Sequence, residues 1–170
     1  MRTILIPILT FFIIHANAQS FQHYTDTLNH FSIDFPASWK YQVEHATKGV
    51  VLETTRVPHG KDTARDIMNV NIIETPRNLE RTFAAYLHYI STPDFKIIAQ
   101  GDTTLNGMPF KYLVSLSNNA YNEKIPMQDY DLVTVRNGKT YIITMMTFPR
   151  TYNEVKPIFD KIANSFKFLD

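Results

Sequence analysis

Alternation of hydrophobic and polar residues predicts a chain rich in short strands. Three segments ahead of the first helical pattern have this character, namely residues 31–35, 50–55 and 67–74. In the last of them Met68, Val70 and Ile72 share one face, while asparagines occupy the other. The polar residues 57–66, which include a proline and a glycine, predict an exposed loop.

A tight hairpin is predicted at Asn137-Gly138, which separates two β-rich runs. Asn and Gly tolerate the positive φ that both central residues of a type I′ turn require. A two-residue loop at this point sets Val135 opposite Thr140 and fixes which side chains share a face.

Asn106-Gly107 predicts a second hairpin, between residues 95–105 and 108–117. Its register places Asp102 opposite Lys111, an opposite-charge pair across the ladder. Pro109 lies close to this turn and cannot donate to the ladder, which favours an edge position or a local irregularity.

The first helical pattern covers residues 79–90. Leu79, Phe83 and Leu87 lie on one stripe of that helix, and Asn78 is placed to cap its N-terminus. Pro93 follows the stripe and stops the helix.

The second helical pattern covers about residues 153–166, with a stripe that includes Phe159. Thr151 with Glu154 resembles a capping box at its start. Pro157 lacks the N–H that a helix interior needs. We therefore expect the regular helix to begin near residue 153 or 154, so that Pro157 falls in its first turn.

The order of elements is strands, helix, strands, helix. This order predicts an α+β fold, with a largely antiparallel sheet and helices that cover it. A doubly wound nucleotide-binding fold is not indicated, because the chain has neither strict strand–helix alternation nor a glycine-rich turn. The expected core comprises Phe35, Trp39, Val70, Ile72, Phe83, Leu87, Val114, Ile143, Phe159, Ile162 and Phe166.

The N-terminus has the three parts of a secretory signal peptide. Arg2 supplies the positive charge, residues 4–14 are almost wholly apolar, and Ala16-Asn17-Ala18 has the small-x-small pattern of a cleavage site. The apolar run is shorter than the ~20 residues that span a bilayer, although an uncleaved anchor is the alternative. We expect residues 1–18 to be removed and residues 19–170 to form a single domain.

Charge and cysteine content narrow the function classes. Loss of residues 1–18 removes Arg2 and no acidic residue, so sixteen basic and sixteen acidic residues remain. A neutral chain argues against nucleic acid as a partner. The absence of cysteine excludes disulfides, a lipid-modified cysteine, thiol catalysis and cysteine-based metal or iron–sulfur sites. The expected location is therefore periplasmic or extracellular, without a lipid anchor.

No motif for a catalytic centre or a cofactor stands out, and we expect neither a cofactor nor a metal. His23, Asp26 and His30 lie near one proposed turn and are the nearest approach to a metal site. Because zinc sites usually have three or four ligands at defined spacing, we interpret them as surface residues of a hairpin. Trp39 is also given a structural role, as a core residue and not as a platform that binds a ligand.

Two long connections are the candidate binding surface. Residues 57–66 offer charge, through Lys61, Asp62 and Arg65, with Asp66 at the end of the stretch. Residues 118–128 offer apolar contacts, through Tyr121, Ile125 and Met127. Long ordered loops in compact domains are often functional, so we expect a protein or peptide partner of the cell envelope to bind there.

Two stretches resemble the PsbP-like family. One is Phe31-Ser32-Ile33-Asp34-Phe35-Pro36-Ala37-Ser38-Trp39, and the other is Ile158-Phe159-Asp160-Lys161-Ile162-Ala163-Asn164-Ser165-Phe166-Lys167-Phe168. The resemblance implies an αβα sandwich around a twisted antiparallel sheet and a role that is not enzymatic. It does not imply a photosynthetic role, because the docking residues on which that role depends have no match here.

Three function hypotheses follow from these features. The first is an exported, non-enzymatic binding or accessory protein. The second is a carrier of a small apolar ligand, held between sheet and helix. The third is a hydrolase whose active site is assembled from residues distant in sequence, since such a site leaves no local motif.

The first prediction concerns export. N-terminal sequencing of material from the periplasm or the medium is expected to begin at Gln19, because Ala16-Asn17-Ala18 is the cleavage pattern. A chain that begins at Met1 and fractionates with membranes would contradict it.

Overall fold

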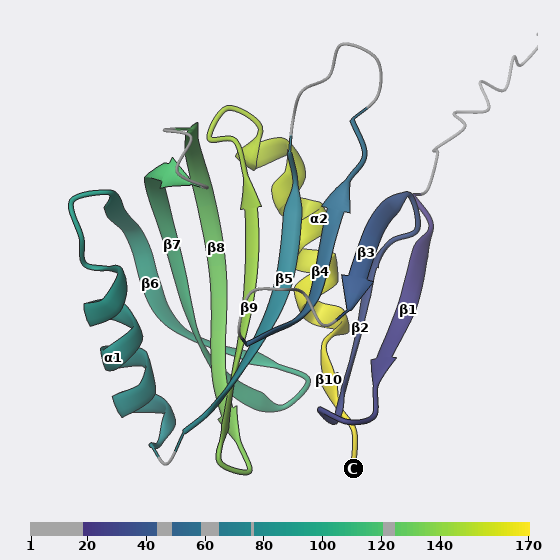
Figure 1. Ribbon diagram of the computed structural model, residues 1–170, viewed down its shortest axis with the longest axis vertical. Helices are drawn as coiled ribbons and strands as arrows, with labels where there is room; N and C mark the ends of the chain where they lie inside the picture. The colour runs from purple at the N-terminus through teal and green to yellow at the C-terminus, as the bar shows by residue number, and fades with distance from the viewer. Residues whose placement is uncertain (1–18, 44–48, 59–64, 76, 121–124) are drawn as a thin grey trace, which may run out of the picture.

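The computed structural model describes residues 19–43, 49–58, 65–75, 77–120 and 125–170. A seven-stranded antiparallel sheet has the order β3-β4-β5-β9-β8-β7-β6, and a three-stranded sheet has the order β1-β2-β10 (Figure 1). The elements are β1 Phe21–Asp26, β2 Phe31–Pro36, β3 Trp39–Val43, β4 Val50–Arg56, β5 Ile67–Glu74, α1 Leu79–Ile90, β6 Phe95–Leu105, β7 Met108–Ala120, β8 Ile125–Arg136, β9 Lys139–Thr147, α2 Tyr152–Ser165 and β10 Lys167–Phe168.

Both Asn-Gly hairpins are confirmed. Asn106 and Asn137 have φ values of 49° and 51°, and the glycines that follow them are also left-handed. Val135 lies opposite Thr140, as the two-residue loop requires. Asp102 lies opposite Lys111, whose ammonium group contacts both Asp102 and Glu80 of α1.

The expectation of an edge strand at Pro109 is wrong, although Pro109 itself lies where β7 has no β8 partner. Pro109 belongs to β7, which is an interior strand, and the irregularity in the β6–β7 ladder lies between Ile97 and Ala99. Pro109 precedes Lys111, the first β7 residue that pairs with β8, so its missing N–H interrupts no β7–β8 pair. Its carbonyl accepts a hydrogen bond from the Thr134 hydroxyl at 2.8 Å.

One face of the large sheet carries most of the core. α2 and the three-stranded sheet cover this face, which lies behind the sheet in Figure 1. The Phe166 ring contacts four other aromatic rings, those of Phe31, Phe110, Tyr141 and Phe168. These contacts join strands of both sheets to the end of α2, which explains why the C-terminal stretch is part of the core.

Most of the expected core is buried. Phe35, Trp39, Val70, Phe83, Ile143, Phe159, Ile162 and Phe166 are buried. Ile72 and Leu87 pack at the edges of the two core clusters and are only partly buried. Val114 is also partly buried, and its neighbour Leu113 is the β7 residue that is enclosed beneath α1.

The start of α2 differs from the prediction. The helix begins at Tyr152, so Pro157 lies in its second turn. Thr151 occupies the N-cap position, but its hydroxyl bonds Phe148 and Thr147 instead of a helix N–H. Pro157 leaves the carbonyl of exposed Asn153 without a helical donor, and water can satisfy that carbonyl.

The second prediction concerns this core. Phe159→Ala is expected to lower the free energy of unfolding by about 3–5 kcal/mol, because Phe159 is fully enclosed by α2 and the sheet. Leu28→Ala is the control, since Leu28 is exposed in the β1–β2 turn. Urea denaturation measures both, and a loss below about 1 kcal/mol for Phe159→Ala would contradict the assigned packing.

Candidate functional site

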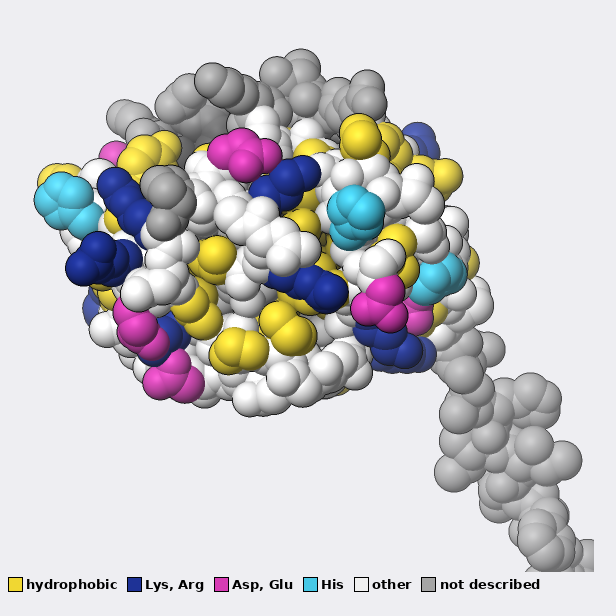
Figure 2. Space-filling view, turned by 90° about the horizontal axis from the view of Figure 1, so that it is seen from below, with side chains coloured by type: hydrophobic (Ala, Val, Ile, Leu, Met, Phe, Trp, Pro, Cys, Tyr) yellow, Lys and Arg dark blue, Asp and Glu magenta, His cyan; other side chains and the backbone are white. Residues whose placement is uncertain are grey.

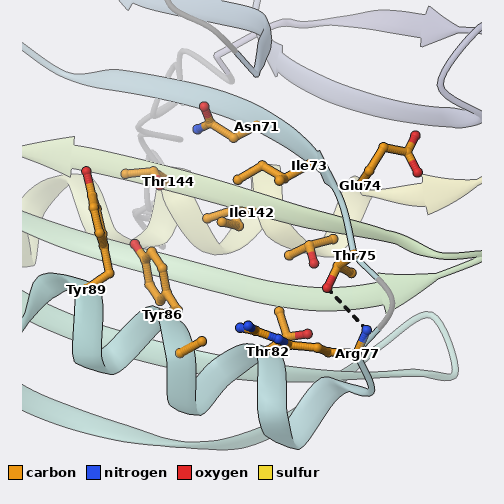
Figure 3. Close-up of a pocket in the computed structure, with 12 residues that line it drawn as sticks. Asn71, Ile73, Glu74, Thr75, Arg77, Thr82, Tyr86, Tyr89, Ile142 and Thr144 are labelled. Carbon is orange, nitrogen blue, oxygen red and sulfur yellow. Dashed lines mark hydrogen bonds between the residues drawn. The ribbon is translucent and has the colours of Figure 1, made fainter.

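The second face of the large sheet is only partly covered. α1 packs on β7 and β8, where Phe83 and Ile90 meet Leu113 and Val133. The strands beside them, β9 and β5, continue past the helix. A cleft of about 680 Å³ lies between α1 and these two strands (Figure 3).

Local structure explains which side chains line the cleft. In α1, Thr82, Tyr86 and Tyr89 follow three- and four-residue steps beside the stripe that faces the sheet. Alternate residues of the two strands supply the opposite wall, including Ile73 of β5 and Ile142 of β9. The cleft therefore combines apolar and aromatic walls with hydroxyl groups, as ligand sites do.

A buried carboxyl group lies directly behind one wall of this cleft. Asp131 of β8 pairs with Thr144 of β9 and is 3% exposed. The hydroxyls of Thr144 and Tyr86 both hydrogen-bond to it. Burial raises the pKa of Asp131 to about 6, although these two hydrogen bonds act in the opposite direction. Burial, together with the charge of Asp131, also raises the pKa of the Tyr86 hydroxyl well above its usual value.

A second buried carboxyl group accompanies the first. Asp129 lies two residues earlier on the same face of β8 and is 6% exposed. Burial, and then the charge of Asp131, raises the pKa of Asp129 to about 8. Because the two groups interact, they titrate as a pair, and at neutral pH the pair holds about one proton and one negative charge.

Four buried polar atoms in this region have no partner within the described part of the chain. They are Oδ1 of Asp129, Oδ1 of Asp131, Oγ of Ser115 and Oγ1 of Thr82. Buried polar groups are nearly always hydrogen-bonded, and buried charges are nearly always paired. Unpartnered carboxyl oxygens beside a cleft therefore mark a candidate functional site.

The structure tests the candidate binding surface only in part. Lys61, Asp62 and Tyr121 lie outside the described residues. Arg65 is exposed, and Ile125 is half-buried as the first residue of β8. Met127 is 1% exposed inside β8, so its proposed role as an apolar contact of a loop is wrong. The reason is that β7 and β8 extend through most of residues 118–128.

Asp66 is likewise not a surface group. Its carboxylate lies 2.6 Å from the Arg56 guanidinium and accepts a hydrogen bond of 2.6 Å from the Thr147 hydroxyl. These contacts join the ends of β4, β5 and β9. Asp66 therefore anchors the strand that follows the loop.

The strands that flank the two proposed loops share one end of the sheet. β4 and β7 end there, and β5 and β8 begin there, because the pairings β4–β5, β5–β9, β9–β8 and β8–β7 are all antiparallel (Figure 1). The two flanking pairs are separated only by β9. A hollow of about 390 Å³, lined by Pro126, Phe148, Pro149 and Arg150, lies beside β8 at this end.

The histidines of the first hairpin do not converge. His23 Nδ1 lies 2.5 Å from an Asp34 carboxylate oxygen, and Asp26 accepts hydrogen bonds from the backbone and side chain of Asn29. Among the described residues, no group of three or more His, Cys, Asp or Glu residues is arranged to hold a metal ion. Trp39 is buried at the start of β3, as a core residue.

Charges of both signs are mixed on the face of the molecule that Figure 2 draws. Figure 2 shows one end of the molecule, where basic, acidic and hydrophobic side chains alternate without an extended patch of one sign. Among the described helices, none is both long enough and apolar enough to cross a bilayer.

Sequence reasoning missed Asp129 and Asp131. The available signal was two acids at i and i+2 on the same strand face as Met127 and Val133, both of which are buried. Alternation alone assigns such acids to solvent. Their burial depends on α1 packing across that strand, which alternation does not reveal.

Comparison with known proteins places the chain in a family. The PsbP family profile matches residues 19–168, so the chain belongs to the PsbP family. No protein with a curated function matches it significantly.

Solved structures share the fold at low sequence identity. Cyanobacterial PsbP (CyanoP) from Synechocystis is 20% identical over 91% of this chain and 95% of its own, with a TM-score of 0.64. The Ran-binding protein Mog1p of Saccharomyces cerevisiae is 8% identical over 90% and 97%, with a TM-score of 0.65. LpqN of Mycobacterium tuberculosis, described as involved in cell envelope biogenesis, is 10% identical over 92% and 88%, with a TM-score of 0.56. The shared fold is the expected PsbP-like α+β sandwich.

The third prediction concerns the buried carboxyl groups. Their folded-state pKa values lie above the value of about 3.9 in an unfolded chain, so their contribution to stability is fully present below pH 4 and is lost as the pH rises through about 6 and about 8. Asp129→Asn removes the part of this pH-dependent loss of stability that the ionisation of Asp129 causes. The variant is expected to be about 1–3 kcal/mol more stable than wild type at pH 8.5, and similar to wild type at about pH 3.5, where both states of wild type are protonated at this position.

Urea denaturation at both pH values measures this difference. Asp94→Asn, at an exposed carboxylate between α1 and β6, is the control and should change little at either pH. Equal stability of Asp129→Asn and wild type at pH 8.5 would show that Asp129 is not held in an unfavourable charged state.

Proposed function

We propose that this protein is an exported, non-enzymatic accessory or binding protein, and that it binds its ligand or partner in the cleft between α1 and strands β5 and β9. The observation that carries the proposal is the cleft itself, which offers about 680 Å³ beside unpartnered buried polar groups. That volume lies within the range of about 300–1,000 Å³ typical of ligand sites.

The lining favours an amphipathic occupant. Ile73 and Ile142 provide an apolar wall, while Tyr86 and Tyr89 present both a ring and a hydroxyl. Such a lining suits a small amphipathic ligand, which differs from the apolar ligand of the carrier hypothesis, and equally a side chain of a partner protein. The mixed lining argues against a purely apolar cargo, because such a cargo would offer no hydrogen-bond donor to the hydroxyl oxygens that line the cleft.

Export is supported by the N-terminal sequence. The family match begins at residue 19, which is also the first residue expected after cleavage of the signal peptide. Neither a lipid-modified cysteine nor a disulfide is available to this chain, so we place it as a free protein in the periplasm or outside the cell.

The loop end of the sheet is proposed as a second contact surface for a protein or peptide partner. Lys61, Asp62, Arg65, Tyr121 and Ile125 belong to this proposal. Its support is that the strand ends flanking both loops lie at the same end of the sheet. The hollow beside Pro126 and Phe148 adds apolar surface there.

A hydrolase is the second candidate function. Two carboxyl groups with raised pKa values are favourable for acid–base catalysis, and Asp129 and Asp131 are such a pair. Both are nearly enclosed, and the Tyr86 hydroxyl lies between the cleft and Asp131, which disfavours direct contact with a substrate. Turnover of a hydrolase substrate that is abolished by Asp131→Asn would establish this alternative.

The fourth prediction tests the cleft. Ala85 lies on the cleft side of α1 and Ala84 faces solvent beside it, so Ala85→Trp fills the cleft and Ala84→Trp is its matched control. Mature wild type, Ala85→Trp and Ala84→Trp are incubated with an extract of the native cell envelope and analysed by native mass spectrometry. We expect one bound species with wild type and with Ala84→Trp, and its loss with Ala85→Trp. Identical recovery by all three proteins, or recovery by none, would contradict a cleft-based function.

A further inference from the structure

The inner wall of the cleft presents hydrogen-bond acceptors. Tyr86 and Thr144 line the cleft, and both hydroxyls hydrogen-bond to Asp131 behind them. An ionised carboxylate can only accept, so a hydroxyl that bonds Asp131 donates its proton to it. The Thr144 hydroxyl also bonds the Tyr86 hydroxyl, so the two hydroxyls share their protons between Asp131 and each other. The oxygen lone pairs that remain toward the cleft can accept hydrogen bonds from a ligand.

A third hydrogen-bond acceptor, the side-chain carbonyl of Asn71, belongs to the opposite wall of the cleft. The amide nitrogen of Asn71 donates to the Asn69 side chain at 2.7 Å. Its carbonyl oxygen remains as an acceptor on a residue that lines the cleft. Both long walls therefore offer oxygen acceptors to a ligand that carries N–H donors.

The negative charge of the buried carboxyl pair behind this wall also favours a ligand that carries N–H donors. Asp129 and Asp131 together keep a negative charge at neutral pH, and no Lys, Arg or His among the described residues forms an ion pair with either of them. Glu74 and Arg77, of opposite sign, are exposed members of the lining and are screened by water. The net field at the inner wall favours a cation.

The aromatic and aliphatic side chains that line the cleft suit the hydrocarbon part of such a ligand. Tyr86 and Tyr89 lie one turn apart on α1 and present their rings along one wall (Figure 3). Aromatic faces attract ammonium and guanidinium groups. Ile73 and Ile142 can pack against methylene or aromatic carbons of the same ligand.

We propose that the cleft recognises a protonated amine or a guanidinium group carried on an apolar stem, with Tyr86, Thr144 and Asn71 accepting its N–H hydrogen bonds. The inference rests on the proposed function, because it names the ligand chemistry of the same cleft. Two sources supply this chemistry: a free organic amine, or a Lys or Arg side chain of a partner protein.

Calorimetric titration with a matched pair of probes tests the inference. Phenethylamine and 2-phenylethanol differ in the ammonium group and share the apolar stem. Wild type at pH 7.5 is expected to bind the amine about ten-fold or more tightly than the alcohol. Asp131→Asn should bring the two affinities within about three-fold, while Asp94→Asn keeps the wild-type ratio. Tyr86→Phe removes one acceptor without changing a charge and should also lower the ratio, which keeps the test decisive if Asp131→Asn does not fold.

A titration with peptides distinguishes a free organic amine from a side chain of a partner protein as the ligand. A blocked tripeptide with a central lysine is compared with its norleucine counterpart and with phenethylamine. Tighter binding of the lysine peptide than of phenethylamine supports a partner side chain as the ligand, and the reverse order supports a free amine. Equal binding of amine and alcohol, both lost in Ala85→Trp, would overturn the amine preference while leaving the cleft as a ligand site. Absence of saturable amine binding in wild type would also overturn the inference.

Discussion

The hydrogen bond between the Tyr86 hydroxyl and the Asp131 carboxyl connects α1 to the centre of the sheet. It lies between the enclosed acids and the cleft, so it determines what the cleft presents to a ligand. Burial of a carboxyl group without a cation is unfavourable, and hydrogen bonds from two hydroxyls offset only part of that cost. The arrangement therefore depends on α1 being held in place by other contacts.

Those contacts are modest on the side of α1 and extensive on the other side of the sheet. α1 contributes Phe83 and Ile90 to a small cluster over β7 and β8. α2 and the three-stranded sheet build the larger core, centred on Phe159, Ile162 and Phe166. The fold thus obtains its stability from one face and leaves the other face partly open. Proteins commonly break local rules of polar burial at functional sites and rely on the remaining core to compensate.

Much of the fold could be predicted because its signals are local. The Asn106-Gly107 and Asn137-Gly138 turns fix the registers of two hairpins, since few other dipeptides accept two successive positive φ values. The stripe from Leu79 to Ile90 predicts α1 with its observed bounds, and Asn78 caps it as expected. The start of α2 was less predictable, because the Thr151 hydroxyl bonds Thr147 instead of the helix.

The candidate site could not be predicted in the same way. Loop length pointed to residues 57–66 and 118–128, but strand pairing extends through most of the second segment and encloses Met127. The cleft arises from the lateral position of α1 over β7 and β8, which is a tertiary property. Asp129 and Asp131 become unusual only once that helix covers them, so their strand pattern alone resembles an ordinary solvated face.

Carbon-13 NMR of the aspartate carboxyl carbons tests the central claim most directly. The claim is that an uncompensated carboxyl pair lies beneath α1 at the inner wall of the cleft. Over a titration from pH 3 to pH 10, the signals of Asp129 and Asp131 are expected to show coupled transitions with apparent pKa values of about 8 and about 6. If both carboxyl groups titrate near pH 4 in the folded protein, the pair is solvated or neutralised and the account of the cleft is wrong.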